Sequence, residues 1–310
     1  MSGPPGMPPG APRTEIVALQ GLDLEVHEGE FFGLLGPNGA GKTTTIGILT
    51  TRVKPTSGTA LVGGADVTHQ DVAVRQRIGV VPQRPNPDRG LNVLENLIFH
   101  AAYFGISSNV AMVRANGLLD QLAILDKANA KVDEMSGGQQ QRLMIARALI
   151  HEPRVIFLDE PTVGLDPQTR LSLWEILRRL HAEGRTIVMT THYMEEADKL
   201  CDRIAIVDRG ELLELDTPEA LKQRAPGGMM IELTLSVDAQ SVVDVARAVD
   251  GVSRVEAQGK VLRVYSDRGG RVISPVIAAA EDGGVNVTNV SLSEPSLETL
   301  FVARTGRKLD

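Results

Sequence analysis

GPNGAGKT, residues Gly36 to Thr43, has the GxxxxGKT pattern of a loop that binds phosphate groups. Its glycines allow backbone N–H groups to converge on phosphate oxygens, where side chains would obstruct them. The apolar run FFGLL, residues 31–35, precedes the loop and predicts a buried parallel strand, and a helix is expected from Lys42 onwards. This strand, loop and helix order favours phosphate binding over an ordinary glycine-rich turn.

The residues of this loop have separate expected roles. Lys42 should reach the β and γ phosphates of a nucleoside triphosphate, and the Thr43 hydroxyl should bind Mg²⁺. The predicted nucleotide-binding set is the loop and the residue after it: Gly36, Pro37, Asn38, Gly39, Ala40, Gly41, Lys42, Thr43 and Thr44.

VIFLDEP, residues 155–161, predicts a second buried strand that ends in two adjacent carboxylates. Asp159 is placed to bind Mg²⁺, directly or through water. Glu160 follows the end of the strand, where it could polarise the attacking water as a general base. The alternative for Glu160 is a solvated loop acid.

MSGGQ, residues 135–139, precedes a run that predicts another helix. A hydroxyl and two glycines at a helix N-terminus favour anion binding, although a serine N-cap is also common without any ligand. Because the motif lies ahead of the acidic strand end, we interpret it as a second phosphate-binding half-site.

In this order the motifs resemble those of the ATP-binding cassette (ABC) family, over about residues 15–222. The resemblance implies that the GxxxxGKT loop is Walker A and that the strand ending in Asp159 and Glu160 is Walker B. It also implies a signature motif that contacts ATP bound to the opposite subunit, formed by Ser136, Gly137, Gly138 and Gln139.

Three further positions gain roles from the same resemblance. Gln83, in GVVPQ, resembles the Q-loop glutamine, which binds Mg²⁺ and senses the membrane partner. Asp166 is similar to the D-loop aspartate. His192, after a third apolar strand, resembles the switch histidine that contacts the γ-phosphate. The implied catalytic residues are thus Glu160, His192 and Gln83, and the implied Mg²⁺ ligands are Thr43, Gln83 and Asp159.

The family resemblance also implies a head-to-tail dimer with ATP between Walker A of one subunit and the signature of the other. ATP would close the dimer and hydrolysis would open it. A second nucleotide-binding subunit, expected to be another copy of this chain, is therefore an implied partner.

The chain departs from the family pattern ahead of Walker A, where an aromatic residue usually stacks on adenine. Arg13 aligns with that position, and its planar guanidinium could replace the aromatic ring. The alternative is that Arg13 lies in a flexible arm and contacts nothing.

The amino-acid composition limits the kinds of partner that the chain is expected to bind. The net charge of −7 includes no basic block, and only 3% of the residues are aromatic, so a nucleic-acid partner is not expected. Cys201 is the only cysteine, so the chain cannot form an internal disulfide, which fits a reducing cytoplasm. No apolar stretch reaches the length of a membrane helix and no signal peptide is recognised, so transport would need a separate permease. The expected location is cytoplasmic and peripheral, on the inner face of the cell membrane.

Three segments are expected. Residues 1–13 are rich in Gly and Pro and predict a disordered arm. Residues 14–226 predict an α/β P-loop NTPase domain of the ABC type, a mixed sheet with a helical subdomain at about 84–140. After a PGG linker, residues 231–310 predict a small α+β accessory or regulatory domain. Its strand, helix, strand, strand, helix, strand order suggests a ferredoxin-like fold.

Longer stretches of the sequence resemble one subfamily in particular, the ATPase subunits of bacterial drug-resistance exporters of the daunorubicin type. They include LNVLENLIFHAAYFGI, TTHYMEEADKLCDRIAIVDRGEL and SLETLFVARTGRKL. The predicted function is therefore ATP hydrolysis that powers a separate permease exporting a drug-like or lipophilic compound. Two alternatives stay open: an ABC ATPase of DNA repair or translation, which would predict basic patches or zinc insertions, and a P-loop kinase, which would lack the signature.

Overall fold

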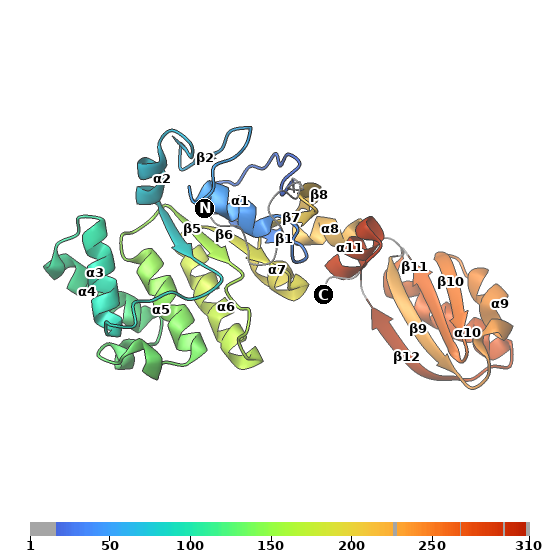
Figure 1. Cartoon of the computed structure of the whole chain (residues 1–310). Helices are drawn as coiled ribbons and strands as arrows, with labels where there is room; N and C mark the ends of the chain where they lie inside the picture. Colours follow the sequence, from blue (N-terminus) through green and yellow to red (C-terminus); the bar gives the residue numbers. More distant parts are fainter. Residues whose placement is uncertain (1–16, 226–227, 267, 294, 308–310) are drawn as a thin grey trace, which may run out of the picture.

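The structure is a computed structural model of the whole chain, and it describes residues 17–225, 228–266, 268–293 and 295–307. The expected arm and Arg13 lie outside the described residues. Figure 1 shows the helical part of the larger region at one end of the molecule and a smaller unit of late strands and helices at the other.

A six-stranded sheet forms the centre of the larger part. Its strand order is β4-β5-β6-β1-β7-β8, and only β8 runs antiparallel to its neighbour. The mixed sheet expected from the sequence is therefore confirmed. The strands are β4 (Ile78–Val81), β5 (Val155–Asp159), β6 (Thr186–Thr191), β1 (Phe31–Leu35), β7 (Arg203–Asp208) and β8 (Glu211–Asp216).

Helices cover both faces of this sheet, because its inner strands are apolar on both sides. Phe31 faces one hydrophobic cluster and Phe32 the other, since successive side chains of a strand point to opposite faces. One face packs on α6 (Pro167–Ala182) and α7 (Met194–Leu200). The other packs on α1 (Lys42–Leu49), α2 (Asp71–Arg77) and the hairpin of β2 (Leu61–Val62) and β3 (Ala65–Asp66).

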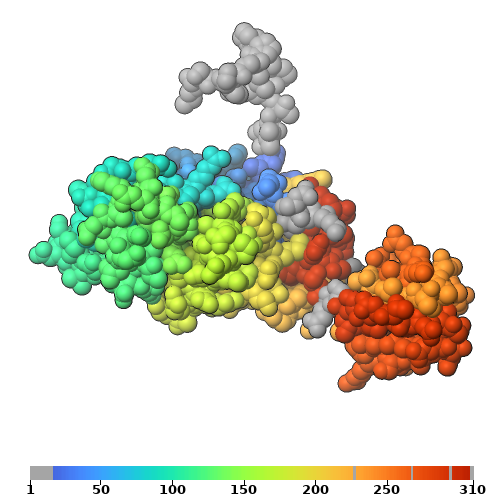
Figure 2. Space-filling model, turned by 90° about the horizontal axis from the view of Figure 1, so that it is seen from below, coloured from blue at the N-terminus to red at the C-terminus, as the bar shows by residue number. Residues whose placement is uncertain are grey.

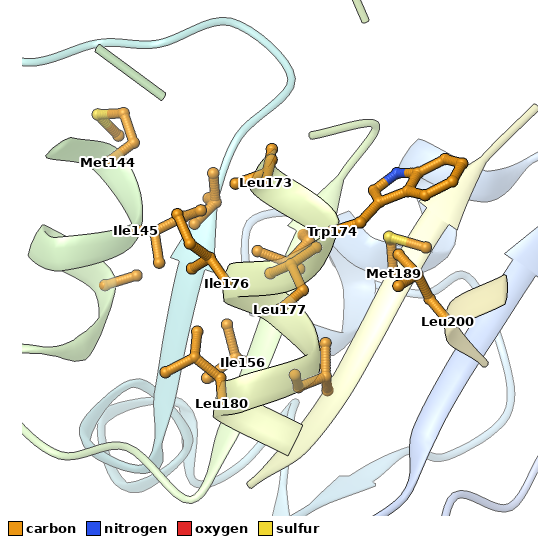
Figure 3. Packing of buried hydrophobic residues seen from close by; sticks show 14 of the residues in the cluster. Met144, Ile145, Ile156, Leu173, Trp174, Ile176, Leu177, Leu180, Met189 and Leu200 are labelled. Atoms are coloured by element: carbon orange, nitrogen blue, oxygen red, sulfur yellow. The ribbon is translucent and has the colours of Figure 1, made fainter. Parts of the chain in front are cut away.

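Helix α6 presents an apolar stripe to the sheet. Leu173, Trp174 and Leu177 are buried in one hydrophobic cluster with Ile156 of β5 and Met189 of β6 (Figure 3). Trp174 is 3% exposed and belongs to this cluster.

The helical subdomain consists of α3 (Val93–Tyr103), α4 (Ser108–Gln121) and α5 (Gly137–Leu149), with 3₁₀ turns at Leu125–Lys127 and Val132–Glu134. Asn92 and Glu95 form a reciprocal capping box at the start of α3. Leu97 and Leu119, which recur at helical spacing in the sequence, are fully buried between these helices.

The smaller unit has its own hydrophobic cluster. It contains β9 (Met229–Leu235), α9 (Val243–Arg247), β10 (Val252–Gln258), β11 (Val261–Ser266), α10 (Ile273–Asp282) and β12 (Val287–Ser293), with 3₁₀ turns at Ala239–Val242 and Gly269–Val272. This is the element order expected from the sequence. β12 pairs with β9 and β10 with β11, and Leu235 N–H donates to the Lys260 carbonyl (2.8 Å). The ferredoxin-like fold stays a prediction.

The last helix, α11 (Leu297–Thr305), returns to the larger part and packs near α7 and α8 (Pro218–Gln223). Leu297, Leu300 and Phe301 are buried in the main cluster, and Arg304 pairs with Glu214 of β8. Figure 2 shows the late, red residues divided between the two lobes. The segment 231–310, expected to be one domain, is therefore divided between two hydrophobic cores.

Candidate functional site

The GxxxxGKT loop lies between the end of β1 and the start of α1. Gly39 (φ 80°) and Gly41 (φ 103°) have left-handed backbones, which glycine adopts without a steric penalty. A Cβ atom on Gly36 would lie 2.2 Å from the Val207 carbonyl oxygen, so the loop can approach β7 only with glycine there. The loop is thus held against the sheet, with the N-terminus of α1 at one end.

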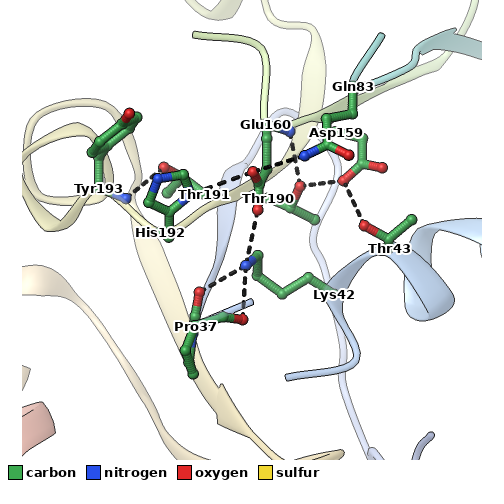
Figure 4. Close-up of polar contacts among 11 residues, drawn as sticks. Pro37, Lys42, Thr43, Gln83, Asp159, Glu160, Thr190, Thr191, His192 and Tyr193 are labelled. Carbon is green, nitrogen blue, oxygen red and sulfur yellow. Dashed lines mark hydrogen bonds and ion pairs between the residues drawn. The ribbon is translucent and has the colours of Figure 1, made fainter. Parts of the chain in front are cut away.

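Lys42 connects this loop to the acidic end of β5. Its side chain is 4% exposed, and Nζ donates to the carbonyls of Gly36 (2.7 Å) and Pro37 (3.1 Å). Nζ also lies 3.0 Å from Glu160 Oε1 (Figure 4). The Lys42 ammonium therefore contacts the loop carbonyls and the predicted general base together.

Glu160 is contacted by residues at the ends of two other strands, β4 and β6. Its Oε2 accepts a hydrogen bond from Gln83 Nε2 (3.1 Å), which follows β4, and lies 3.3 Å from Nδ1 of His192, which follows β6. Glu160 has a left-handed backbone (φ 47°), and its N–H donates to the carbonyl (3.1 Å) and hydroxyl (3.0 Å) oxygens of Thr190. The three predicted catalytic residues thus lie together.

Asp159 is held by two hydroxyl groups. Thr190 Oγ1 donates to Asp159 Oδ1 over 2.7 Å, and Thr43 Oγ1 lies 3.3 Å from the same oxygen. Thr190 pairs with Asp159 across the β5–β6 ladder, so strand order determines its position. Sequence reasoning did not identify Thr190, because the position of β6 beside β5 is not a local signal.

The Tyr193 ring packs against His192, and the Arg170 guanidinium packs against Tyr193. The Tyr193 ring is 4.2 Å from the His192 ring, and the Arg170 guanidinium lies 4.3 Å above the Tyr193 ring. The Tyr193 N–H donates to the Thr191 hydroxyl (2.9 Å), which fixes the turn after β6. These contacts restrain the orientation of His192, and neither Tyr193 nor Arg170 was predicted from the sequence.

A cleft of about 500 Å³ opens over the loop. It is lined by residues that follow the ends of four strands, β1, β4, β5 and β7, and by residues ahead of β1: Val17, Ala18, Gln20, Pro37, Asn38, Gly39, Ala40, Gly41, Lys42, Thr43, Thr44, Gln83, Glu160 and Arg209. The predicted loop residues other than Gly36 therefore share one cavity with two of the predicted catalytic residues.

The predicted signature lies outside this cleft. Ser136 is the N-cap of α5: its hydroxyl accepts from Gln139 N–H (3.3 Å), and its own N–H donates to Gln139 Oε1 (3.0 Å). Ser136 and Gly137 are exposed to solvent. A Cβ atom on Gly138 would lie 2.3 Å from Thr169 Cγ2, so the start of α5 packs closely on the start of α6.

Asp166 caps α6 next to this contact. Its Oδ1 accepts from Thr169 N–H (3.0 Å) and its Oδ2 from the Thr169 hydroxyl (2.6 Å). These hydrogen bonds, the side-chain one foremost, lower the pKa of Asp166 below its ordinary value. The predicted signature and the predicted D-loop aspartate thus form one exposed surface, separate from the cleft of the same chain.

The side-chain oxygens beside the loop are suited to bind a Mg²⁺ ion that is also bound by a nucleotide. Among the described residues, no group of three or more His, Cys, Asp and Glu side chains could hold a metal by itself. Mg²⁺ commonly uses one or two carboxylates together with substrate phosphates. The Asp159 carboxylate and the Thr43 hydroxyl are adjacent, and the Gln83 amide lies on the same side of the loop (Figure 4).

This fold and this loop define a P-loop nucleotide-binding cassette. Residues 19–163 match the family described as "ABC transporter". The chain is 42% identical to the daunorubicin resistance ATP-binding protein DrrA2 of Streptomyces coeruleorubidus, over 94% of this chain and 92% of that protein. It is 36% identical to the linearmycin resistance ATP-binding protein LnrL of Bacillus subtilis (strain 168), over 94% of each. The chain therefore belongs to the ATP-binding proteins of the ABC transporter family, which are ATPases.

Further similarities agree with this assignment. A Nod factor export ATP-binding protein I of Burkholderia orbicola is 40% identical over 94% of this chain and 93% of that protein. The dimeric post-hydrolysis structure of the ATP-binding cassette MJ0796 bound to ADP and Pi superposes with a TM-score of 0.61 at 32% identity, covering 67% of this chain and 93% of that one. Membership of this family excludes the kinase alternative, and these relatives give no support to a role in DNA repair or translation. Within the described residues, no helix combines the length and the hydropathy that a bilayer span requires.

Proposed function

We propose that this chain is the ATP-hydrolysing subunit of an ABC exporter and drives a separate membrane permease that transports a drug-like or lipophilic compound. The observation that carries the proposal is the convergence of Lys42, Gln83 and His192 on Glu160, beside the phosphate-binding loop. The relatives named for daunorubicin resistance, linearmycin resistance and Nod factor export support the export direction.

ATP would lie with its phosphates on the loop and compete with Glu160 for Lys42. The β and γ phosphates would attract Nζ, because a phosphate carries more charge than a carboxylate. This exchange would release Glu160 to accept a proton from the attacking water. His192, restrained by Tyr193, would donate a hydrogen bond to the γ-phosphate.

Thr43, Gln83 and Asp159 would hold Mg²⁺, which when bound neutralises charge on the β and γ phosphates. The hydrogen bond from Thr190 fixes the Asp159 carboxylate for this role (2.7 Å). Removal of Mg²⁺ by EDTA should therefore abolish phosphate release by the purified protein and weaken ATP binding. Undiminished hydrolysis in EDTA would contradict the assignment of these ligands.

A second copy of the chain would complete each nucleotide site. The signature at the start of α5 is exposed and lies outside the cleft of its own chain, so another subunit can reach it. The dimeric cassette similar to this chain supports a head-to-tail arrangement. We propose a homodimer with two ATP molecules at its interface.

Helix α3 offers a surface for the permease. Phe99 and Tyr103 are 55% and 88% exposed on this helix, whereas Val93, Leu97 and Ala101 are buried. The segment from Gln83 leads directly into α3, so a partner on these aromatics could sense movement of the glutamine. This contact would place the protein at the inner face of the cell membrane. Substitution of both residues by Ser should reduce recovery with the membrane fraction and leave ATP hydrolysis intact.

The smaller unit of β9 to β12 is proposed to regulate the ATPase or assist dimerisation. Its independent hydrophobic cluster permits removal of residues 229–293 while α11 is retained through a flexible linker. The shortened protein should bind ATP but differ in dimerisation. Loss of ATP affinity in a folded variant would contradict this role.

Drug export can be tested in cells that express the chain together with its permease. Resistance to a panel of lipophilic drugs should rise in these cells and disappear when Lys42→Ala replaces the natural residue. Equal resistance with the substituted chain would show that this ATPase does not power the export.

A further inference from the structure

The cleft has two chemically different ends. One end is the phosphate-binding loop with Lys42 and Thr43, and the other is formed by Val17, Ala18, Gln20 and Arg209. If ATP places its phosphates on the loop, as proposed above, its sugar and base extend toward the second end. None of the lining residues in the described part of the chain is aromatic, so the base needs another planar partner.

Arg209 lies in a tight turn between β7 and β8. Asp208 and Glu211 are paired in the ladder, so the loop contains only Arg209 and Gly210. Both have positive φ angles, 50° and 80°. A two-residue hairpin loop of this kind favours Asn-Gly or Asp-Gly, because side chains such as that of arginine are sterically unfavourable in the left-handed region. The turn alone does not explain an arginine at this position.

Contacts on both sides fix this turn against the cleft. Gly210 N–H donates to the Ala40 carbonyl of the phosphate loop (2.9 Å), and Gln20 N–H donates to the Gly210 carbonyl (2.8 Å). Gln20 Nε2 also donates to the Arg209 carbonyl (3.3 Å). A Cβ atom on Gly210 would lie 2.6 Å from the Ala18 carbonyl oxygen, which shows how tightly the turn is held. The position of Arg209 relative to the loop is therefore well determined.

The guanidinium of Arg209 is available to a ligand. Among the described residues it has no carboxylate partner, and the neighbouring Asp208 is engaged by Arg307. Arginine remains charged and presents a planar face that stacks on aromatic rings. Stacking on a nucleotide base is largely independent of base identity, because every base has a π face.

We infer that Arg209 binds the base of the nucleotide, with its guanidinium stacked on the ring in place of an aromatic side chain. The unfavourable backbone of Arg209 fits this role, since residues in sparsely populated conformations occur preferentially at binding sites. Recognition by stacking predicts similar affinity for adenine and guanine nucleotides. The inference rests on the proposed use of this cleft for ATP.

Equilibrium binding to the full-length protein can test this inference with ADP, GDP and tripolyphosphate as ligands. Arg209→Gly suits the turn and removes the side chain, while Arg209→Lys keeps the charge without the plane. Both should weaken ADP and GDP binding, the glycine variant by about 5- to 150-fold, and leave tripolyphosphate binding unchanged. Ala123→Gly is the matched control, because Ala123 also has a positive φ (53°) and does not line the cleft.

Two outcomes would overturn the inference. Unchanged ADP affinity in Arg209→Gly would show that the side chain does not contact the nucleotide, most clearly if Arg13→Ala reduced the affinity instead. An equal loss for tripolyphosphate would show that Arg209 binds phosphate rather than the base. If the wild-type protein bound neither ADP nor ATP, the proposed function would fail instead.

Discussion

Lys42 Nζ lies 3.0 Å from Glu160 Oε1, and their side chains are 4% and 5% exposed. The lysine predicted to bind phosphate and the predicted general base thus form one buried ion pair. A buried charge that loses its partner strongly destabilises the folded state, so removal of either residue should lower the free energy of unfolding. Nucleotide binding would exchange this pair for a contact between Lys42 and phosphate, which links occupancy of the cleft to release of Glu160.

We predict that Lys42→Ala lowers the free energy of unfolding by about 3–5 kcal/mol, because Glu160 would be left without its cation. The double variant with Glu160→Gln should recover much of this loss. Denaturant unfolding of the two single variants and the double variant provides the cycle. Strictly additive effects would show that the two residues are not coupled.

Ser136→Arg is expected to abolish ATP-dependent dimerisation while ADP affinity of the monomer stays near the wild-type value. Ser136 is exposed and outside the cleft of its own chain, so bulk and charge there obstruct only the opposing subunit. Light scattering with ATP and equilibrium binding of ADP would measure the two effects.

Ser136→Ala controls for the lost helix cap, which is worth about 1 kcal/mol. Its unfolding free energy should fall by about that amount, and its ADP affinity as a monomer should stay near the wild-type value. If Ser136→Arg lost ADP binding as a monomer, the model of two half-sites would be wrong.

Glu196 predicts a pH dependence of stability. It is fully buried, and burial raises its pKa above the ordinary 4.5, while hydrogen bonding, including that from Trp174 Nε1 (3.0 Å), and the charge of Arg170 oppose the shift. The folded state therefore prefers the neutral acid. This contribution to stability is complete below pH about 4.5 and is lost as the pH rises through the raised pKa.

Glu196→Gln keeps the size of the side chain and removes its titration. The unfolding free energy of this variant, relative to wild type, should increase as the pH rises above about 4.5. Fluorescence of Trp174, the only tryptophan of the chain, can follow unfolding. A difference that is independent of pH would contradict the prediction.

Helix α11 should stabilise the nucleotide-binding part. Phe301 is fully buried in the main cluster, so Phe301→Ala should cost about 3–5 kcal/mol in unfolding free energy. Leu292→Ala, in β12, should change it by no more than about 0.5 kcal/mol, because that side chain is 51% exposed. Similar costs for the two variants in urea unfolding would show that α11 adds little to the core.

Local patterns in the sequence were sufficient for the central part of the fold and for most candidate site residues. The loop at Gly36–Thr43 and the strand ending in Asp159 are short signals whose chemistry depends on adjacent residues. Thr190 and Arg209 were missed because their positions depend on strand order and on a turn that packs against the loop. The return of α11 was missed for a related reason: its apolar residues specify a helix but not the core in which they pack.

The central claim is that Glu160 is the general base of an ATPase. The direct measurement is ATP turnover and bound-nucleotide content of Glu160→Gln beside the wild-type protein. Loss of a general base typically costs about 10²- to 10⁴-fold in rate, while Lys42 and Thr43 remain to bind phosphate and Mg²⁺. We predict slow turnover with ATP retained on the protein, and turnover near the wild-type rate would contradict the account.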